Sequence, residues 1–218
     1  MDIRTSDTTI PAGEVRLTGD LVVPADARGI ILFAHGSGSS RHSPRNRMVA
    51  EALNRYALAT VLVDLLTREE EAVDDRTGAL RFDIGLLTGR LVSIVDWLAT
   101  GEPAGRLPIG LFGASTGAAA ALSAAAQRPD QVYAVVSRGG RPDLAGADLP
   151  RVRADTLLLV GGLDDEVLRL NNQALAELDS GAELRVVPGA SHLFEEPGTL
   201  DRVARDAAEW FVDHLPPS

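Results

Sequence analysis

The chain has 218 residues, of which 45% are hydrophobic, so it can bury one substantial core, and we expect a single domain over residues 1–218. Its formal net charge of −10, with no run of basic residues, argues against nucleic acid or an anionic membrane as a partner. The sequence contains no cysteine, which excludes disulfides, a thiolate nucleophile and thiolate metal sites.

The first part of the chain predicts strands and no targeting segment. Residues 1–13 lack the basic and apolar regions of a signal peptide, and no apolar stretch reaches the roughly 20 residues of a membrane span, so we expect a cytoplasmic protein. Alternation over Val15–Val23 predicts an early antiparallel strand pair or one bent strand that ends at Pro24. The continuous apolar run Gly29–Ala34 predicts a strand buried on both faces.

Helices and strands then alternate. A loop rich in glycine and serine, residues 35–40, leads into a helix with apolar residues at helical spacing over 48–56. Thr60–Leu65 predicts the next buried strand, and the acidic stretch Thr67–Gly78 is expected to be a surface loop. Apolar residues over 84–98 then predict a strongly amphipathic helix.

The second half continues the alternation. Further strands are predicted at 109–112, Val132–Ser137, Thr156–Val160 and Leu184–Val187, with a closing helix from about Thr199. The connection between the strands at Val132 and Thr156 is predicted to be mostly loop, too short for a large lid. The pattern predicts an α/β fold: a doubly wound, mostly parallel sheet with helices on both faces, which binds ligands at the carboxyl ends of its strands.

The motif G-x-S-x-G spans Gly113–Gly117, between a predicted strand and a helix of small residues. A serine on so tight a turn is held in a strained conformation, and the flanking glycines avoid collisions with neighbouring backbone. Ser115 could also be an ordinary turn serine or a helix N-cap. Its position at a strand-to-helix joint favours the nucleophile of a serine hydrolase.

A serine nucleophile needs a general base and an acid that orients the base. Asp164 and His192 each follow a predicted strand, in the chain order Ser, Asp, His that this topology uses. Asp165 is a rival for the acid, but the pattern Gly-x-x-Asp-x-x-Val favours Asp164. The oxyanion would be stabilised by the backbone N–H groups of Thr116 and Ser37.

Three further residues beside the predicted site are candidates for substrate binding: Arg41, His42 and Arg138. His42 can equally lie on a solvated loop, and Arg138 can equally form a structural ion pair. A structural role in holding the oxyanion loop is expected for His35. The four histidines are scattered without ligand spacing, so neither a metal nor a cofactor is predicted.

These motifs resemble the α/β-hydrolase superfamily, and more narrowly its small dienelactone-hydrolase-like members. The resemblance covers nearly the whole chain, including LFAHGSGSSRHSPRN (Leu32–Asn46), LFGASTGAAAAL (Leu111–Leu122) and PGASHLFEEPG (Pro188–Gly198). Authentic dienelactone hydrolases use a cysteine nucleophile, whereas this chain has Ser115, which implies a carboxylic-ester hydrolase. The chain is also similar to domains fused behind phosphoribosyltransferase domains.

We therefore expect a cofactor-free serine esterase that cleaves small or short-acyl carboxylic esters through an acyl-enzyme. An acyltransferase or perhydrolase could use the same triad with another acceptor in place of water. A catalytically idle hydrolase fold that serves as a binding module is a third alternative. A small-molecule ester is the expected partner, and the expected assembly is a monomer or homodimer.

Overall fold

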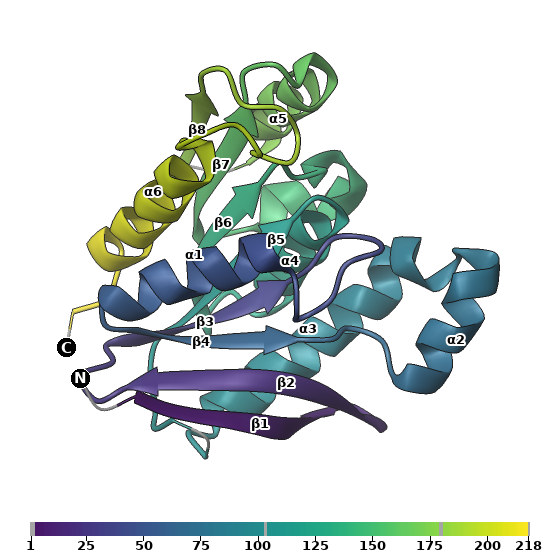
Figure 1. The fold of residues 1–218 in the computed structure, drawn as a ribbon, viewed down its shortest axis with the longest axis vertical. Coiled ribbons are helices and arrows are strands. Elements are labelled where there is room, and N and C mark those ends of the chain that lie inside the picture. The colour runs from purple at the N-terminus through teal and green to yellow at the C-terminus, as the bar shows by residue number, and fades with distance from the viewer. Residues whose placement is uncertain (1–2, 103, 179–180, 218) are drawn as a thin grey trace.

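The computed structural model describes residues 3–102, 104–178 and 181–217 (Figure 1). The strands form one eight-stranded sheet in the order β1-β2-β4-β3-β5-β6-β7-β8. The strands are β1 (Ile3–Ala12), β2 (Val15–Pro24), β3 (Gly29–Ala34), β4 (Leu58–Val63), β5 (Ile109–Ala114), β6 (Val132–Arg138), β7 (Asp155–Gly161) and β8 (Ala182–Val187). The helices are α1 (Pro44–Arg55), α2 (Arg68–Thr77), α3 (Ile84–Ala99), α4 (Thr116–Gln127), α5 (Asp165–Glu177) and α6 (Thr199–Asp213), with 3-10 helices η1 (Leu80–Phe82) and η2 (Pro142–Arg151).

Strands β3 to β8 pair in parallel, whereas β1 and β2 are antiparallel to their neighbours. One face of the sheet packs on α3, α4 and the inner side of α5. The other face packs on α1 and α6 (Figure 1). This arrangement confirms the predicted doubly wound, mostly parallel α/β fold.

The central strands are buried along their whole length. Every residue of β3, β4 and β5 is buried, as their continuous apolar sequences predicted. The register pairs Phe33 with Phe112 and Ala34 with Gly113. The ends of β3 and β5 therefore lie side by side, which brings the loop after β3 next to the G-x-S-x-G turn.

At the N-terminal edge, β2 pairs with β1 in a hairpin from Ile3–Pro24 to Ala12–Val15. Of the two alternatives predicted for Val15–Val23, the single strand that ends at Pro24 is confirmed as β2, and the strand pair within these residues is wrong. The antiparallel partner lies in the preceding residues. Those residues show little alternation, and they include Pro11, which lacks the N–H that an interior strand must donate. Pro11 is tolerated here because β1 is an edge strand.

The surface loop predicted over Thr67–Gly78 is instead the helix α2. A capping box starts it: the Thr67 hydroxyl accepts the N–H of Glu70, and the Glu70 carboxylate accepts the N–H of Thr67 at 2.8 Å. The sequence is too acidic to show an apolar face, so periodicity missed the helix. The spacing Thr-x-x-Glu was the signal that could have found it.

The connection between β6 and β7 was predicted to be mostly loop, but it contains the 3-10 helix η2, interrupted at Gly146. It is a short element that leaves the fold without a large lid. Among the helices of the described residues, none is long and apolar enough to cross a membrane.

Candidate active site

Ser115 occupies the turn from β5 into α4 with φ 51° and ψ −122°, a conformation that non-glycine residues rarely adopt. It stands at the N-cap position of α4, yet its side chain makes no capping hydrogen bond. A serine that served the helix as a cap would accept such a bond. The strained backbone therefore presents a hydroxyl that the helix does not use.

The glycines of the motif allow close backbone approach. A Cβ built on Gly113 would lie 2.4 Å from Ala118 Cα, in α4. One built on Gly117 would lie 2.3 Å from the carbonyl oxygen of Ala34, at the end of β3. Any side chain at either position would push α4 away from the sheet. Both glycines are therefore needed for the close packing that positions Ser115 at the ends of the strands.

His192 and Asp164 lie together at the same sheet edge, on the loops after β8 and β7. His192 Nδ1 is 2.6 Å from Asp164 Oδ2. Asp164 is the N-cap residue of α5 but makes no side-chain cap bond, so its carboxylate is free to bind the histidine. Asp165, the first residue of α5, is exposed. A carboxylate bound to Nδ1 fixes the tautomer that carries the proton there and leaves Nε2 as a base.

The loop that carries His192 is held by its own residues. The Glu196 carboxylate accepts the backbone N–H of Ser191 at 3.0 Å, and hydrogen bonds from Ser191 hold the pKa of Glu196 below its usual value. Phe194 is buried with φ 55° and anchors the loop in the core. Sequence reasoning gave neither residue a role, because neither carries a motif of its own.

His192 also lies close to the end of β6. A Cβ built on Gly139 would be 3.6 Å from His192 Cε1, and Ser115 N–H donates to the carbonyl of Arg138 at 3.2 Å. The serine and the histidine thus both adjoin the end of β6. The hydrogen bonds between described residues include none between the Ser115 hydroxyl and His192, and such bonds often tighten only when substrate binds.

The two residues predicted to donate to the oxyanion, Ser37 and Thr116, are hydrogen-bonded to each other. The backbone N–H of Ser37 donates to Thr116 Oγ1 at 2.9 Å, which ties the loop after β3 to the start of α4. The backbone N–H of Thr116 is at the first turn of α4, where intrahelical partners are lacking. The Ser37 N–H, by contrast, is already engaged, a contact that sequence reasoning did not anticipate.

His35 holds the same loop from below. Its Nε2 accepts the N–H of Leu65 at 3.1 Å, and its Nδ1 lies 3.0 Å from the carbonyl of Gly36. Burial lowers the pKa of His35, although the Gly36 carbonyl opposes that shift. The ring is therefore a neutral link between the loop and the residue after β4, with its proton on Nδ1.

Arg41 and His42 point to other partners. Arg41 forms ion pairs with Asp64 and, at 3.4 Å, with Asp20. His42 Nδ1 is 2.9 Å from an exposed nitrogen of Arg47. These contacts engage the Arg41 side chain in ion pairs, so we leave Arg41 out of the proposed substrate site. His42 also lines the cavity described next, and its role in substrate binding stays a prediction.

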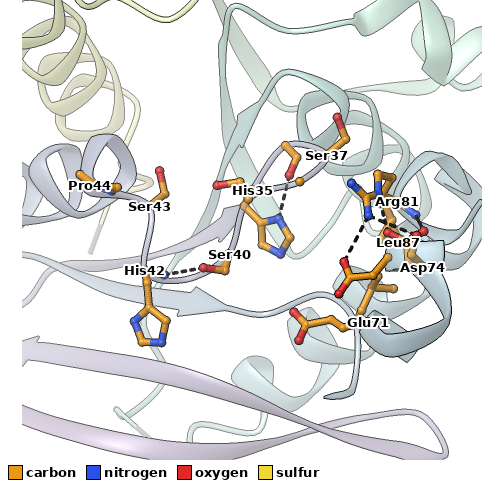
Figure 2. Close-up of a pocket in the computed structure, with 15 residues that line it drawn as sticks. His35, Ser37, Ser40, His42, Ser43, Pro44, Glu71, Asp74, Arg81 and Leu87 are labelled. Carbon is orange, nitrogen blue, oxygen red and sulfur yellow. Dashed lines mark hydrogen bonds and ion pairs between the residues drawn. The ribbon is translucent and has the colours of Figure 1, made fainter. Parts of the chain in front are cut away.

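A cavity of about 520 Å³ lies beside the loop that follows β3, residues 35–40. Residues 35–40 and 42–44 form one wall, and the facing wall carries Glu71, Asp74 and Arg81, as Figure 2 shows. Arg81 Nε binds Asp74 Oδ2 at 2.5 Å, so this pair is structural. Partial burial, with the nearby charges of Asp64 and Asp75, raises the pKa of Glu71.

Gly36, in the cavity wall, packs against the nucleophile, because an added Cβ would lie 3.0 Å from Ser115 Cβ. Ser115, Asp164 and His192 themselves do not line the cavity. The facing wall was missed from the sequence because it belongs to α2 and to the segment that follows it. Across residues 3–102, 104–178 and 181–217, no three His, Asp or Glu side chains form a group that could hold a metal ion.

Comparison with known proteins places this chain in a family. Dienelactone hydrolase from Anabaena variabilis, known from its crystal structure, is 57% identical in sequence. The match covers 98% of this chain and 99% of that one, and the two structures superimpose with a TM-score of 0.96. A carboxyl esterase from Tuber melanosporum shares only the fold, with 16% identity, coverage of 99% and 88%, and a TM-score of 0.74. No protein-family model matches the chain.

The fold and its elbow are those of an α/β-hydrolase. The chain belongs to the dienelactone-hydrolase-like family within that class. A Mycobacterium tuberculosis protein provisionally named a phosphoribosyl transferase is also 57% identical, over 213 residues that make up 98% of this chain and 47% of that protein. The chain therefore spans about half the length of the curated relatives that it matches.

Proposed function

We propose that the chain is a serine hydrolase that cleaves small or short-acyl carboxylic esters through an acyl-enzyme. The observation that carries the proposal is Ser115, held at φ 51° without a capping bond beside the Asp164–His192 pair. A turn serine with a purely structural role would have no reason to bear this strain. The hydrolase and esterase names of the structural neighbours support the same class.

In the proposed reaction, His192 Nε2 takes the proton of the Ser115 hydroxyl while its oxygen attacks the ester carbonyl carbon. Asp164 stabilises the imidazolium that forms. The tetrahedral intermediate expels the alcohol, which takes its proton from His192, and leaves the acyl group on Ser115. Water, activated by the same histidine, then attacks the acyl-enzyme and releases the acid.

The developing oxyanion would accept the backbone N–H of Thr116, at the positive end of the α4 dipole. We propose Ser37 as the second donor. In the free enzyme, Thr116 Oγ1 takes the place of the substrate oxygen as the acceptor of the Ser37 N–H, so the donor stays ordered before substrate arrives.

The cavity favours small substrates. It has a volume of about 520 Å³, and Glu71, Asp74, Asp75 and Arg81 bring charge to its walls. Burying a long hydrocarbon chain against these side chains would remove charged groups from water without offering them hydrogen bonds in return. We therefore propose that short acyl groups are preferred over long lipid chains.

The test combines a variant with a series of substrates. Ser115→Ala should abolish hydrolysis of 4-nitrophenyl esters and labelling by a fluorophosphonate, while the circular dichroism spectrum and melting temperature stay those of the wild type. In the wild type, the adduct mass should map to Ser115, and kcat/KM should fall from butyrate to dodecanoate.

Full esterase activity of Ser115→Ala would exclude the mechanism. Faster cleavage of the dodecanoate would exclude the short-acyl preference, and failure of the wild type to label would favour the binding-module alternative.

The longer mycobacterial relative carries a name that describes a different reaction. We propose that phosphoribosyl transfer belongs to the other half of that protein, because the elements of this half build a hydrolase site. Acyl transfer to an acceptor other than water stays an alternative for the same triad, and product analysis with added alcohol, amine or peroxide tests it.

A further inference from the structure

Asn171, in α5, carries a buried amide with one bond that reaches outside its own helix. The residue is 0% exposed, and its Nδ2 donates to the carbonyls of Val167 at 2.8 Å and Gly140 at 2.9 Å. Its Oδ1 is buried with no hydrogen-bond partner among the described residues. A buried acceptor without a partner lowers stability, so an apolar side chain would serve better if the position only had to pack. The amide is therefore explained by what its nitrogen binds.

The two bonds of this nitrogen differ in kind. Val167 precedes Asn171 by about one helical turn, and the exposed Asn172 makes the same bond to the carbonyl of Leu168, at 2.9 Å. Such a bond is local to the helix and requires no burial. Gly140, by contrast, belongs to the segment that follows β6. The bond to Gly140 thus joins two separate parts of the fold.

Residues 138–141, which we term the bracing segment, bind the backbone of the nucleophile from both ends. The Ser115 N–H donates to the carbonyl of Arg138 at 3.2 Å, and the Arg141 N–H donates to the carbonyl of Ser115 at 3.1 Å. The backbone of Ser115 is strained at φ 51°, and these two bonds help to hold it there. Arg138 thus contacts the nucleophile through its main chain, whereas substrate binding by its buried side chain stays a prediction.

The middle of the bracing segment has no side chains of its own. A Cβ built on Gly139 would lie 3.2 Å from the carbonyl oxygen of His192, so the segment also packs against the histidine loop. The Gly139 N–H donates to the carbonyl of Leu159 at 2.7 Å. Among the described residues, the Gly140 carbonyl accepts a hydrogen bond from Asn171 only. Because consecutive glycines leave a backbone many conformations, this bond restricts the segment where it is most free to move.

The helix α5 also carries the proposed acid of the triad. Asp164 is its N-cap residue, and Asn171 follows seven residues later, after about two helical turns. Residues at that spacing lie on the same side of a helix. One helix therefore presents both the carboxylate that binds His192 and the amide that binds the bracing segment.

We propose that Asn171 is a positioning residue for the nucleophile. By holding the Gly140 carbonyl, it fixes the bracing segment, and the two ends of that segment keep Ser115 in its strained conformation beside His192. Asn171 itself contacts neither the Ser115 hydroxyl nor the substrate. This inference rests on the proposed function and adds to it a residue that links the acid helix to the nucleophile.

The kinetic test uses a matched pair of variants. A serine in Asn171→Ser can still donate to the carbonyl four residues earlier, but it is too short to reach Gly140. For 4-nitrophenyl butyrate, kcat should fall about tenfold while KM stays within about twofold, since a displaced nucleophile reacts more slowly but binding is unchanged. The rate of labelling by a fluorophosphonate should fall by the same factor. Asn172→Ser makes the same change at the exposed neighbour and should keep the wild-type values.

Hydrogen exchange of backbone amides, followed by NMR, tests the segment without turnover. The Ser115 and Arg141 amides should exchange faster in Asn171→Ser than in Asn172→Ser or the wild type. Wild-type kcat in Asn171→Ser, or exchange no faster than in Asn172→Ser, overturns the proposal. If the wild type does not label, the proposed hydrolase is excluded, and exchange still decides whether Asn171 holds the segment. If Asn171→Ser does not fold, Asn171→Leu, which has a similar size but no donor, decides in its place.

Discussion

At the scale of single residues, two adjacent aspartates occupy different environments. Asp164 precedes α5 and turns its carboxylate to His192, whereas Asp165 starts the helix and is exposed. A carboxylate in the first turn of a helix is stabilised by the helix dipole, which explains Asp165 without any catalytic role. The sequence pattern favoured Asp164, and the contact at 2.6 Å supports that choice over its neighbour.

A matched pair of variants separates the two. Asp164→Asn should lower kcat by about 10³-fold to 10⁴-fold, because an amide that donates to Nδ1 selects the wrong tautomer of His192. Asp165→Asn changes the same charge one residue away and should keep kcat within about twofold. Steady-state hydrolysis of 4-nitrophenyl butyrate measures both, and equal losses in the two variants would contradict the assignment.

At the scale of elements, the bond from Ser37 N–H to Thr116 Oγ1 joins the loop after β3 to the start of α4. Thr116→Val keeps the shape of the side chain but removes the acceptor, so a partly buried N–H loses its partner and the loop is free to move. We expect kcat to fall about tenfold, since a displaced donor stabilises the oxyanion less well. Thr116→Ser keeps the hydroxyl and should retain most of the activity.

Steady-state kinetics with one short-chain ester decide between these outcomes. A Thr116→Val enzyme with the kcat of the wild type would show that the tether has no catalytic effect. The melting temperatures of both variants serve as the control, because Thr116 is also buried at the start of α4.

Whether an element could be predicted from the sequence depends on what stabilises it. The strands β3 and β5 are buried on both faces, so their apolar runs were sufficient to predict them. The helix α2 is stabilised by its capping box and by the bond of Glu70 to Arg90 at 2.6 Å, neither of which produces periodicity. The strand β1 exists because β2 pairs with it over its whole length, and pairing is a non-local property.

In the candidate site, too, the sequence could predict some features and not others. Ser115, Asp164 and His192 each follow a strand, and topology alone brings such positions to one edge of a parallel sheet. The engaged N–H of Ser37 and the unpartnered guanidinium of Arg138 depend on where side chains turn after the backbone is placed. No spacing in the sequence encodes those directions.

At the scale of the whole molecule, the partly buried His35 couples folding stability to pH. Burial lowers its pKa in the folded state, so the unfolded chain binds a proton more readily near pH 6.5. The contribution of His35 to stability is complete above the unfolded pKa and is lost as the pH falls toward the folded value. The free energy of unfolding should therefore decrease between pH 7 and pH 5.

Urea unfolding across this pH range measures the effect, with His35→Gln as the matched variant. A glutamine amide can accept the N–H of Leu65 but does not titrate, so the pH dependence should become shallower. An equally steep dependence in His35→Gln would assign the loss of stability to other groups.

The glycines around Ser115 also limit how this chain can change over time. Every replacement of Gly113 or Gly117 adds at least a Cβ, which would lie within 2.4 Å of backbone atoms of α4 or β3. No smaller residue exists, and the obstructing atoms are main chain, so a second substitution elsewhere cannot make room. Loops and helix surfaces of this protein can accept substitutions during evolution, whereas positions 113 and 117 accept no residue other than glycine.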